Sequence, residues 1–310
     1  MTKEYTLYIA ESNVESDGNN VYLSFITDAQ RFIINYAVSD IRNGNFPHVG
    51  ITAREGLAVL YKNYDECIGN VSQGEWMPVD LLARDYKSLI NMSHMIKRGQ
   101  KYKIIIYGPI LAHLERLSVE IDESDYYCSK SMRSNLKKIL FLGGAKTFGI
   151  GVTSTAMMFS NIIRRNNEIE VDRISYNQRN FLKNISDFLD DTIETINYDM
   201  IILESDGIGQ DKKMIECYLD KILSQLSKDC VILIWHSLPK TDLEKKKLLS
   251  GIVKNRVLYS TNCIYLNLDF IFSEEYIDLC TYSVNFVNDA GNILIYESLN
   301  QEIKRCLWNI

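Results

Sequence analysis

The sequence has little of what marks nucleic-acid-binding, membrane and secreted proteins. Its 34 basic side chains are outnumbered by 40 acidic ones and are dispersed among them, so the chain lacks the one-signed basic face that nucleic acid or an anionic membrane requires. No apolar run approaches the roughly 18 residues of a membrane span, and residues 1–10 lack the basic start and apolar core of a signal peptide. We therefore expect a cytoplasmic protein that binds neither nucleic acid nor membrane.

Metal and disulfide signatures are also missing. The seven cysteines are odd in number and include no CxxC pair, and the four histidines show no zinc-ligand spacing. Most cysteines lie in apolar stretches, as Cys230 does, which predicts reduced core thiols. The four prolines and abundant Asn, Lys, Ile and Tyr are typical of a low-GC bacterial coding bias. We expect no metal and no cofactor.

What the chain does have is 46% apolar residues over 310 positions, which is enough for about two domains with ordinary cores. Residues 1–125 contain short β-rich runs separated by polar turns, which predicts a β-sandwich of the jelly-roll type. Residues 126–136 are polar and aperiodic, and are predicted to be a linker. The β-rich runs are 5–9, 21–26, 58–61, 102–107 and 117–121.

In residues 137–310 the pattern changes to strands that alternate with helices. The strands are continuously apolar, which predicts a flavodoxin-like, doubly wound parallel sheet covered on both faces. Ligands of such α/β domains bind at the carboxyl ends of the strands. The predicted strands are 139–143, 200–203, 231–235 and 263–268, and the predicted helices are 154–166, 211–226, 241–253 and 290–308.

The loop after the first of these strands carries a motif. It reads LGGAKTFGIGV (142–152) and fits neither a GxGxxG fingerprint nor a GxxxxGK[ST] phosphate loop. It resembles block I of the SGNH/GDSL hydrolase superfamily, strand-Gly-Asp-Ser-x-Thr-x-Gly, whose Ser is the nucleophile. Gly143, Thr147 and Gly149 keep this frame, but Gly144 takes the Asp position and Ala145 the Ser position. A methyl group cannot attack a carbonyl.

The end of the chain resembles the closing block of the same superfamily, Asp-x-x-His-Pro-Asn-x-x-Gly. Asn288 and Gly291 are retained, while Ser283 stands at the Asp position and Phe286 at the His position. Phenylalanine cannot accept a proton, so the general base is missing as well. No histidine follows His236, so a shift of register does not restore one.

Weaker matches extend the resemblance to most of the chain. Tyr176 lies nearest the position of the family's oxyanion-hole glycine, with Asn177 beside it, and residues 204–207 match the Gly-x-Asn-Asp block loosely. Residues 56–61 and 102–109 resemble the β-sandwich that precedes the hydrolase domain in one branch, whose substrates are acyl esters, often acetylated carbohydrates. An engineered Ser→Ala change would account for Ala145 alone, but not for the other replacements.

Other strand-end residues have a functional and a plain interpretation each. His236 could be a relocated base with Ser237 or Ser154 as nucleophile, but we expect an imidazole hydrogen-bonded to loop backbone. Lys146 could anchor an anion, but we expect it to be solvated. Glu204 and Asp206 could pair as acid and base or hold a cation, but we expect them to face solvent or cap a helix. Trp235 could equally stack on a ligand or pack in the core.

These observations favour a pseudoenzyme that binds a ligand or acts as an accessory or scaffold protein for a partner enzyme. The resemblance implies an acyl, glycan or peptide ligand. A repurposed hydrolase or acyl/group transferase is the alternative, and a structural or oligomerisation role is the third. The sequence does not predict an oligomeric state. The candidate pocket residues are Gly144, Ala145, Lys146, Tyr176, Asn177, Glu204, Asp206, His236 and Phe286.

Overall fold

The computed structural model divides into two compact units. The first comprises Met1–Asn135 and Thr153–Ala156, and the second comprises Leu136–Val152 and Met157–Ile310. The residues that the structure describes are 1–9, 22–39, 49–65, 70–71, 76–82, 86–129, 136–167, 169–175, 198–206, 212–225, 230–239, 243–258, 262–283 and 286–308.

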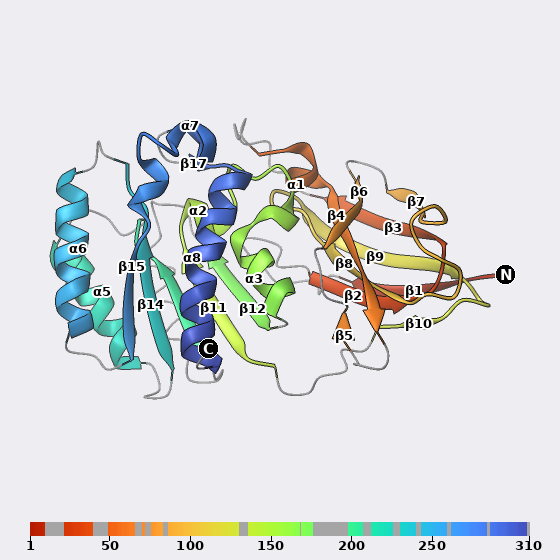
Figure 1. Ribbon diagram of the computed structural model, residues 1–310, viewed down its shortest axis with the longest axis horizontal. Coiled ribbons are helices and arrows are strands. Elements are labelled where there is room, and N and C mark those ends of the chain that lie inside the picture. The colour runs from red at the N-terminus through yellow and green to blue at the C-terminus, as the bar shows by residue number, and fades with distance from the viewer. Residues whose placement is uncertain are drawn as a thin grey trace. The chain divides into compact units, whose positions relative to one another are not determined.

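The first unit is built almost entirely from antiparallel strands (Figure 1). They are β1 (Thr2–Ile9), β2 (Tyr22–Thr27), β3 (Arg31–Ser39), β4 (Leu57–Asp65), β5 (Asn70–Val71), β6 (Met77–Leu82), β7 (Lys87–Asn91), β8 (Tyr102–Tyr107), β9 (His113–Asp122) and β10 (Tyr127–Cys128), with one short helix, α1 (Ile51–Glu55). One sheet has the order β1-β9-β3-β7, and the other has the order β10-β2-β8-β4-β5, with β6 also paired to β4.

Alternating side chains explain why these two sheets pack face to face. In β3 every second residue is buried, beginning with Phe32, while its neighbours point outward. The buried set joins residues of the other sheet, such as Phe25 and Val59, in one apolar cluster. The predicted β-sandwich is confirmed. Part of the segment predicted as a linker differs, because Tyr127 and Cys128 pair with β2 and thus belong to the sandwich.

The second unit contains a five-stranded parallel sheet of order β12-β11-β13-β14-β15, which is the predicted flavodoxin-like topology. Its strands are β11 (Lys138–Gly143), β12 (Glu170–Ser175), β13 (Met200–Glu204), β14 (Val231–His236) and β15 (Cys263–Asn267). The longer helices are α3 (Phe159–Asn167), α5 (Lys212–Gln225), α6 (Leu243–Leu258) and α8 (Asp289–Trp308). Shorter elements are α2 (Ala145–Phe148), η1 (Thr155–Met157), η4 (Asp269–Phe272), α7 (Ile277–Cys280), β16 (Thr281–Ser283) and β17 (Phe286–Val287).

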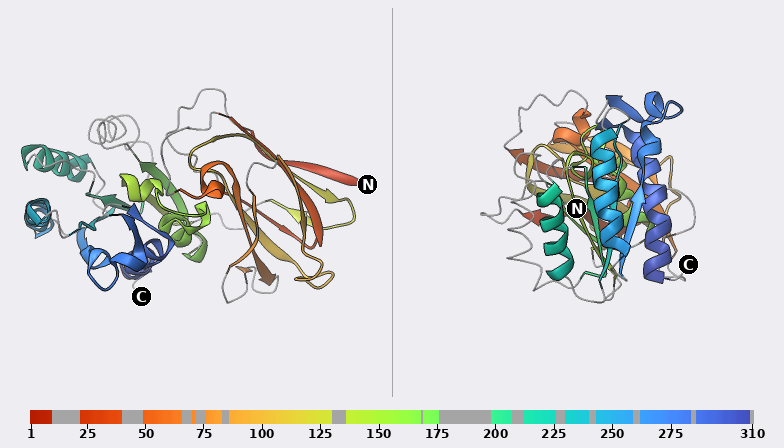
Figure 2. Two further views of the ribbon diagram at one scale, coloured as in Figure 1. Left: turned by 90° about the horizontal axis from the view of Figure 1, so that it is seen from above. Right: turned by 90° about the vertical axis from the view of Figure 1, so that its left-hand side faces the viewer.

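Both faces of this sheet are covered, which is why its strands are continuously apolar. On one face Leu140 and Leu203 pack with α5 and α6. On the other face Phe141 and Trp235 pack with α3 and α8. Figure 2 shows the helices from two further sides.

One sequence expectation shifts in detail. The helix expected over 154–166 begins at Phe159, because residues 155–157 form a 3-10 turn instead.

In the described part of the chain six cysteines are free thiols, and burial raises the pKa of Cys230 and Cys263 to about 11. No described helix combines the length and apolar character that a membrane crossing requires.

Candidate functional site

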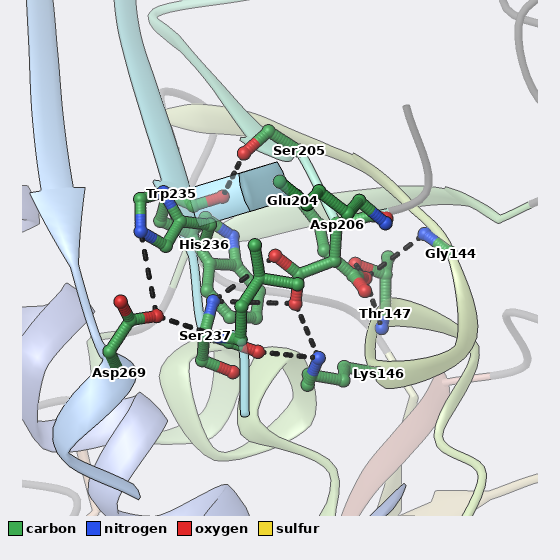
Figure 3. A network of polar contacts seen from close by, with 12 residues as sticks. Gly144, Lys146, Thr147, Glu204, Ser205, Asp206, Trp235, His236, Ser237 and Asp269 are labelled. Carbon is green, nitrogen blue, oxygen red and sulfur yellow. Dashed lines mark hydrogen bonds and ion pairs between the residues drawn. The ribbon is translucent and has the colours of Figure 1, made fainter. Parts of the chain in front are cut away.

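Polar side chains from four segments meet at the carboxyl edge of the parallel sheet (Figure 3). Strand β11 leads into α2, while Glu204 and His236 are the last residues of β13 and β14. Asp269 follows β15 at the start of η4. Because parallel strands end at one edge, the topology brings these residues together from positions far apart in the sequence.

Glu204 holds the loop after β11 in place through hydrogen bonds. Its Oε2 accepts hydrogen bonds from the backbone N–H of Gly144 (3.0 Å), the backbone N–H of Thr147 (2.8 Å) and Thr147 Oγ1 (2.7 Å). A Cβ at Gly143 would lie 2.0 Å from Thr147 Oγ1 and 2.6 Å from Glu204 Oε2, so this packing requires glycine. Burial and the nearby Asp206 raise the pKa of Glu204, opposed by Lys146 and the bonds from Thr147.

Lys146 and Asp206 form a buried ion pair beside it. The Lys146 ammonium donates to Asp206 Oδ2 and to the Ser237 carbonyl oxygen (3.1 Å), and the Ser237 N–H donates to Asp206 Oδ1 (3.1 Å). Lys146 is 5% exposed and Asp206 is 7% exposed. Burial alone would lower the pKa of Lys146, but the carboxylates of Asp206 and Glu204 hold it above its usual value.

These positions overturn two expectations. Lys146 is not solvated, and Glu204 and Asp206 are buried and do not face solvent. Glu204 does bond the start of a helix, since it accepts the N–H groups of Gly144 and Thr147 at the N-terminus of α2. The reason is that each group finds its partner at a neighbouring strand end, and a buried charge must be paired. Glu204 bonds the α2 turn, and Asp206 bonds the Lys146 ammonium. The interpretations of the two carboxylates as an acid–base pair or as a cation site stay predictions.

His236 belongs to a second group. Its fully buried ring lies 3.1 Å from Tyr265 Oη through Nδ1 and 3.5 Å from Asp269 Oδ1 through Nε2. Asp269 also accepts the N–H of Leu238 (2.7 Å) and faces the Lys246 ammonium (3.3 Å). Burial would raise the pKa of Asp269, but these three partners lower it. The expected loop imidazole bonded to backbone is therefore wrong, because His236 ends a strand and contacts side chains.

No described serine completes a nucleophile–base pair with His236. Ser237 Oγ is buried and has no hydrogen-bond partner among the described residues. Ser154 Oγ accepts the N–H of Ala156 (3.3 Å). Trp235 is fully buried with its ring edge-on to Phe159, at 5.6 Å between centroids, so it packs in the core and does not present a stacking surface.

The positions that match the catalytic triad of the SGNH/GDSL hydrolases lie on neighbouring elements. Ala145 is partly exposed at the first position of α2. Phe286, half-buried, pairs with Ser283 across β16 and β17, and β17 contacts α2. Gly151, at φ +105°, permits this approach, since a Cβ there would lie 2.1 Å from the Val287 carbonyl oxygen.

Some predicted residues are not placed and some observed ones were missed. Tyr176 and Asn177 lie outside the described residues. Asp269 and Tyr265 were not predicted, although the strand-end rule applied to β15 would have pointed to Asp269. In the described part of the chain no three His, Cys, Asp or Glu side chains are placed to hold a metal ion.

Comparison with proteins of known structure shows which proteins share this fold. No protein-family model matches the chain, and no curated protein matches it in sequence. Among solved structures, a GDSL-like protein from Bacteroides ovatus superposes with a TM-score of 0.73 at 16% identity, covering 93% of this chain and 85% of that one. A family two carbohydrate esterase from Cellvibrio japonicus gives 0.60 at 11% identity, covering 99% and 98%.

A third structure is the salicylyl-acyltransferase of a tetracycline biosynthetic pathway. It gives a TM-score of 0.60 at 15% identity, covering 92% of this chain and 82% of that one. The chain therefore has the fold of the SGNH/GDSL hydrolases and acyltransferases, as the sequence resemblance implied.

Proposed function

We propose that this protein is a catalytically inactive relative of the SGNH hydrolases that binds a ligand, or serves a partner enzyme as an accessory or scaffold protein. The observation that carries the proposal is Ala145. It stands at the nucleophile position of α2, next to the element that carries Phe286 at the base position. Neither side chain can attack a carbonyl or accept a proton.

The strand-end network supports the same proposal. An enzyme that had recruited new residues would present at least one nucleophile or base to a substrate. Lys146 is instead ion-paired with Asp206, and Glu204 is hydrogen-bonded to the turn that follows β11. Removing either Lys146 or Asp206 would leave a buried charge unpaired, and removing Glu204 would leave the N–H groups of the turn without their acceptor. We infer that the network supports the turn that carries Ala145.

The activities of two fold neighbours support an inference about the ligand class. One acts on carbohydrate esters and one transfers a salicylyl group. We infer an acyl or glycan ligand beside Ala145, near the strand β17 that carries Phe286 and contacts α2. A peptide of a partner enzyme is the other occupant to test.

An esterase assay with a designed reactivation tests inactivity. The wild-type protein should not hydrolyse p-nitrophenyl acetate or acetylated xylo-oligosaccharides above the buffer rate. The variant Gly144→Asp/Ala145→Ser/Ser283→Asp/Phe286→His supplies the nucleophile, the base and the two Asp residues of the motifs, and Ala145→Ser alone is its matched control. Wild-type turnover that is abolished by His236→Gln would refute the proposal.

A repurposed hydrolase or transferase is the second candidate, and one observation favours it. His236 is oriented by Asp269, and an imidazole fixed by a carboxylate is the arrangement of a general base. Native mass spectrometry of the purified protein separates the candidates further. A retained, unmodified small molecule favours binding, and an acyl adduct on the protein favours group transfer.

A further inference from the structure

The β-sandwich unit carries a groove that the proposed function does not use. It has a volume of about 660 Å³ and opens on the outer face of the sheet β1-β9-β3-β7. Since Phe32 and Ile34 point into the core, Arg31 and Ile33 of β3 point outward. Ile33 pairs with Leu89 of β7, which is 61% exposed, so an apolar pair lies on this face.

Polar groups of both signs surround this apolar pair. The lining includes the carboxylates of Asp28, Glu120, Asp122 and Asp125, and the guanidinium groups of Arg31 and Arg98.

Three of the charged groups have hydrogen-bonding capacity to spare. Among the described residues, no donor is bonded to the Asp125 carboxylate, and neither Arg31 nor Arg98 forms an ion pair. Burial, with Asp28 and Asp122 nearby, raises the pKa of Asp125, opposed by Arg98. These groups therefore offer both acceptors and donors to a ligand.

The mixture of acidic and basic side chains in the lining decides the ligand class. The carboxylates between the arginines disfavour the binding of an anion. For a metal ion, the described residues nowhere bring three ligating side chains together. A neutral polyol suits the lining better, because each hydroxyl both donates and accepts, and the C–H face of a sugar ring can cover Ile33 and Leu89. The groove lies within the roughly 300–1,000 Å³ of small-molecule sites.

We propose that this groove binds a neutral oligosaccharide through Asp125, Arg31 and Arg98, with the ring seated on Ile33 and Leu89. The site lies in the sandwich unit, so its occupancy is independent of whether the strand-end edge of the other unit binds or reacts.

Isothermal titration of the full chain with a panel of oligosaccharides tests the proposal. The neutral probes are cellohexaose, mannohexaose, xylohexaose and maltohexaose, and the charged ones are hexamers of galacturonic acid and of glucosamine. At least one neutral probe should bind more tightly than both charged ones. Leu89→Ser and Asp125→Asn should each weaken that binding at least about fivefold.

Matched variants outside the groove control for general damage. Leu279 is 64% exposed in the other unit, so Leu279→Ser serves as the control for Leu89→Ser, and Asp278→Asn for Asp125→Asn. Both controls should bind like the wild type, and circular dichroism melting verifies that all four variants fold. Either of two results overturns the proposal: none of the neutral probes binds, or a charged probe binds best. Binding that Ala145→Phe abolishes and Leu89→Ser leaves intact also overturns it, because the sugar then lies at the strand-end edge.

Discussion

Replacing Lys146 by methionine tests whether the strand-end charges form a closed structural network. Methionine fills a similar volume but removes the ammonium that faces Asp206, whose side chain is 8% exposed. The remaining partner of that carboxylate is the Ser237 N–H, at 3.1 Å from Oδ1. Breaking one partner of a buried pair leaves an uncompensated charge, so we expect a loss of about 3–5 kcal/mol in the free energy of unfolding.

Two further variants test whether the loss of stability comes from the unpaired buried charge. Lys146→Met/Asp206→Leu removes both charges, and buried pairs replaced by apolar residues are often neutral, so most of the lost stability should return. The exposed pair of Lys138 and Glu170 gives the matched control, because their side chains are 46% and 49% exposed at 3.3 Å. Lys138→Met should cost less than about 1 kcal/mol.

Urea unfolding followed by tryptophan fluorescence measures these differences. Trp235 is fully buried beside Phe159 and reports on the second unit. A closed network is contradicted if the unfolding free energy of Lys146→Met lies within about 1 kcal/mol of the wild-type value, or if the double variant is no more stable than the single one. Because the pKa of Lys146 is raised, its contribution is present below the ordinary value of 10.5 and is lost as pH rises through the folded-state pKa.

The remaining predictions concern a glycine with a left-handed backbone, the dependence of stability on acidic pH, and a helix cap. Gly151→Ala should cost more than about 2 kcal/mol in thermal unfolding, because φ is +105° and the Cβ would lie 2.1 Å from the Val287 carbonyl oxygen; an unchanged Tm would contradict the close approach. The pKa of Asp269 is lowered from 3.8, so its stabilisation is present above that value and is lost as pH falls through the folded-state pKa. Asp269→Asn should therefore flatten the acid limb of a Tm-against-pH curve. Asn288 Oδ1 accepts the N–H of Gly291 at the start of α8, so Asn288→Ala should cost about 1 kcal/mol in urea unfolding, and no loss would argue against the cap.

The fold was accessible from the sequence because its signals are local. Continuous apolar runs such as 139–143 and 231–235 predicted a sheet buried on both faces, and short β-rich runs between polar turns predicted a sandwich. The alternating strand β3 was not among the predicted runs. The strand order could then be inferred from the resemblance and from the handedness of strand-helix-strand crossovers.

The state of the charged residues was not accessible, because it depends on pairings between distant positions. Lys146 bonds the Ser237 carbonyl 91 residues away, and Thr147 bonds Glu204 57 residues away. In the sequence each residue has only its neighbours, and an isolated lysine or glutamate in a loop is most often solvated. Pairing needs the lateral order of the strands and the depth of each side chain, neither of which the hydrophobic pattern specifies.

The structure also separates two sets of positions within the family's block I. Gly143 is required by the contact between Thr147 and Glu204, and Gly149 ends α2 in the left-handed region at φ 91°. These residues shape the turn whatever the chemistry. Ala145 is partly exposed, and none of the contacts that hold Gly143 and Gly149 involves its side chain. Gly143 and Gly149 are therefore explained by side-chain packing and backbone geometry in the turn, without reference to catalysis. A serine at position 145 would occupy this turn, and Phe286, carried by the strand that contacts α2, would offer it no nitrogen to act as a base.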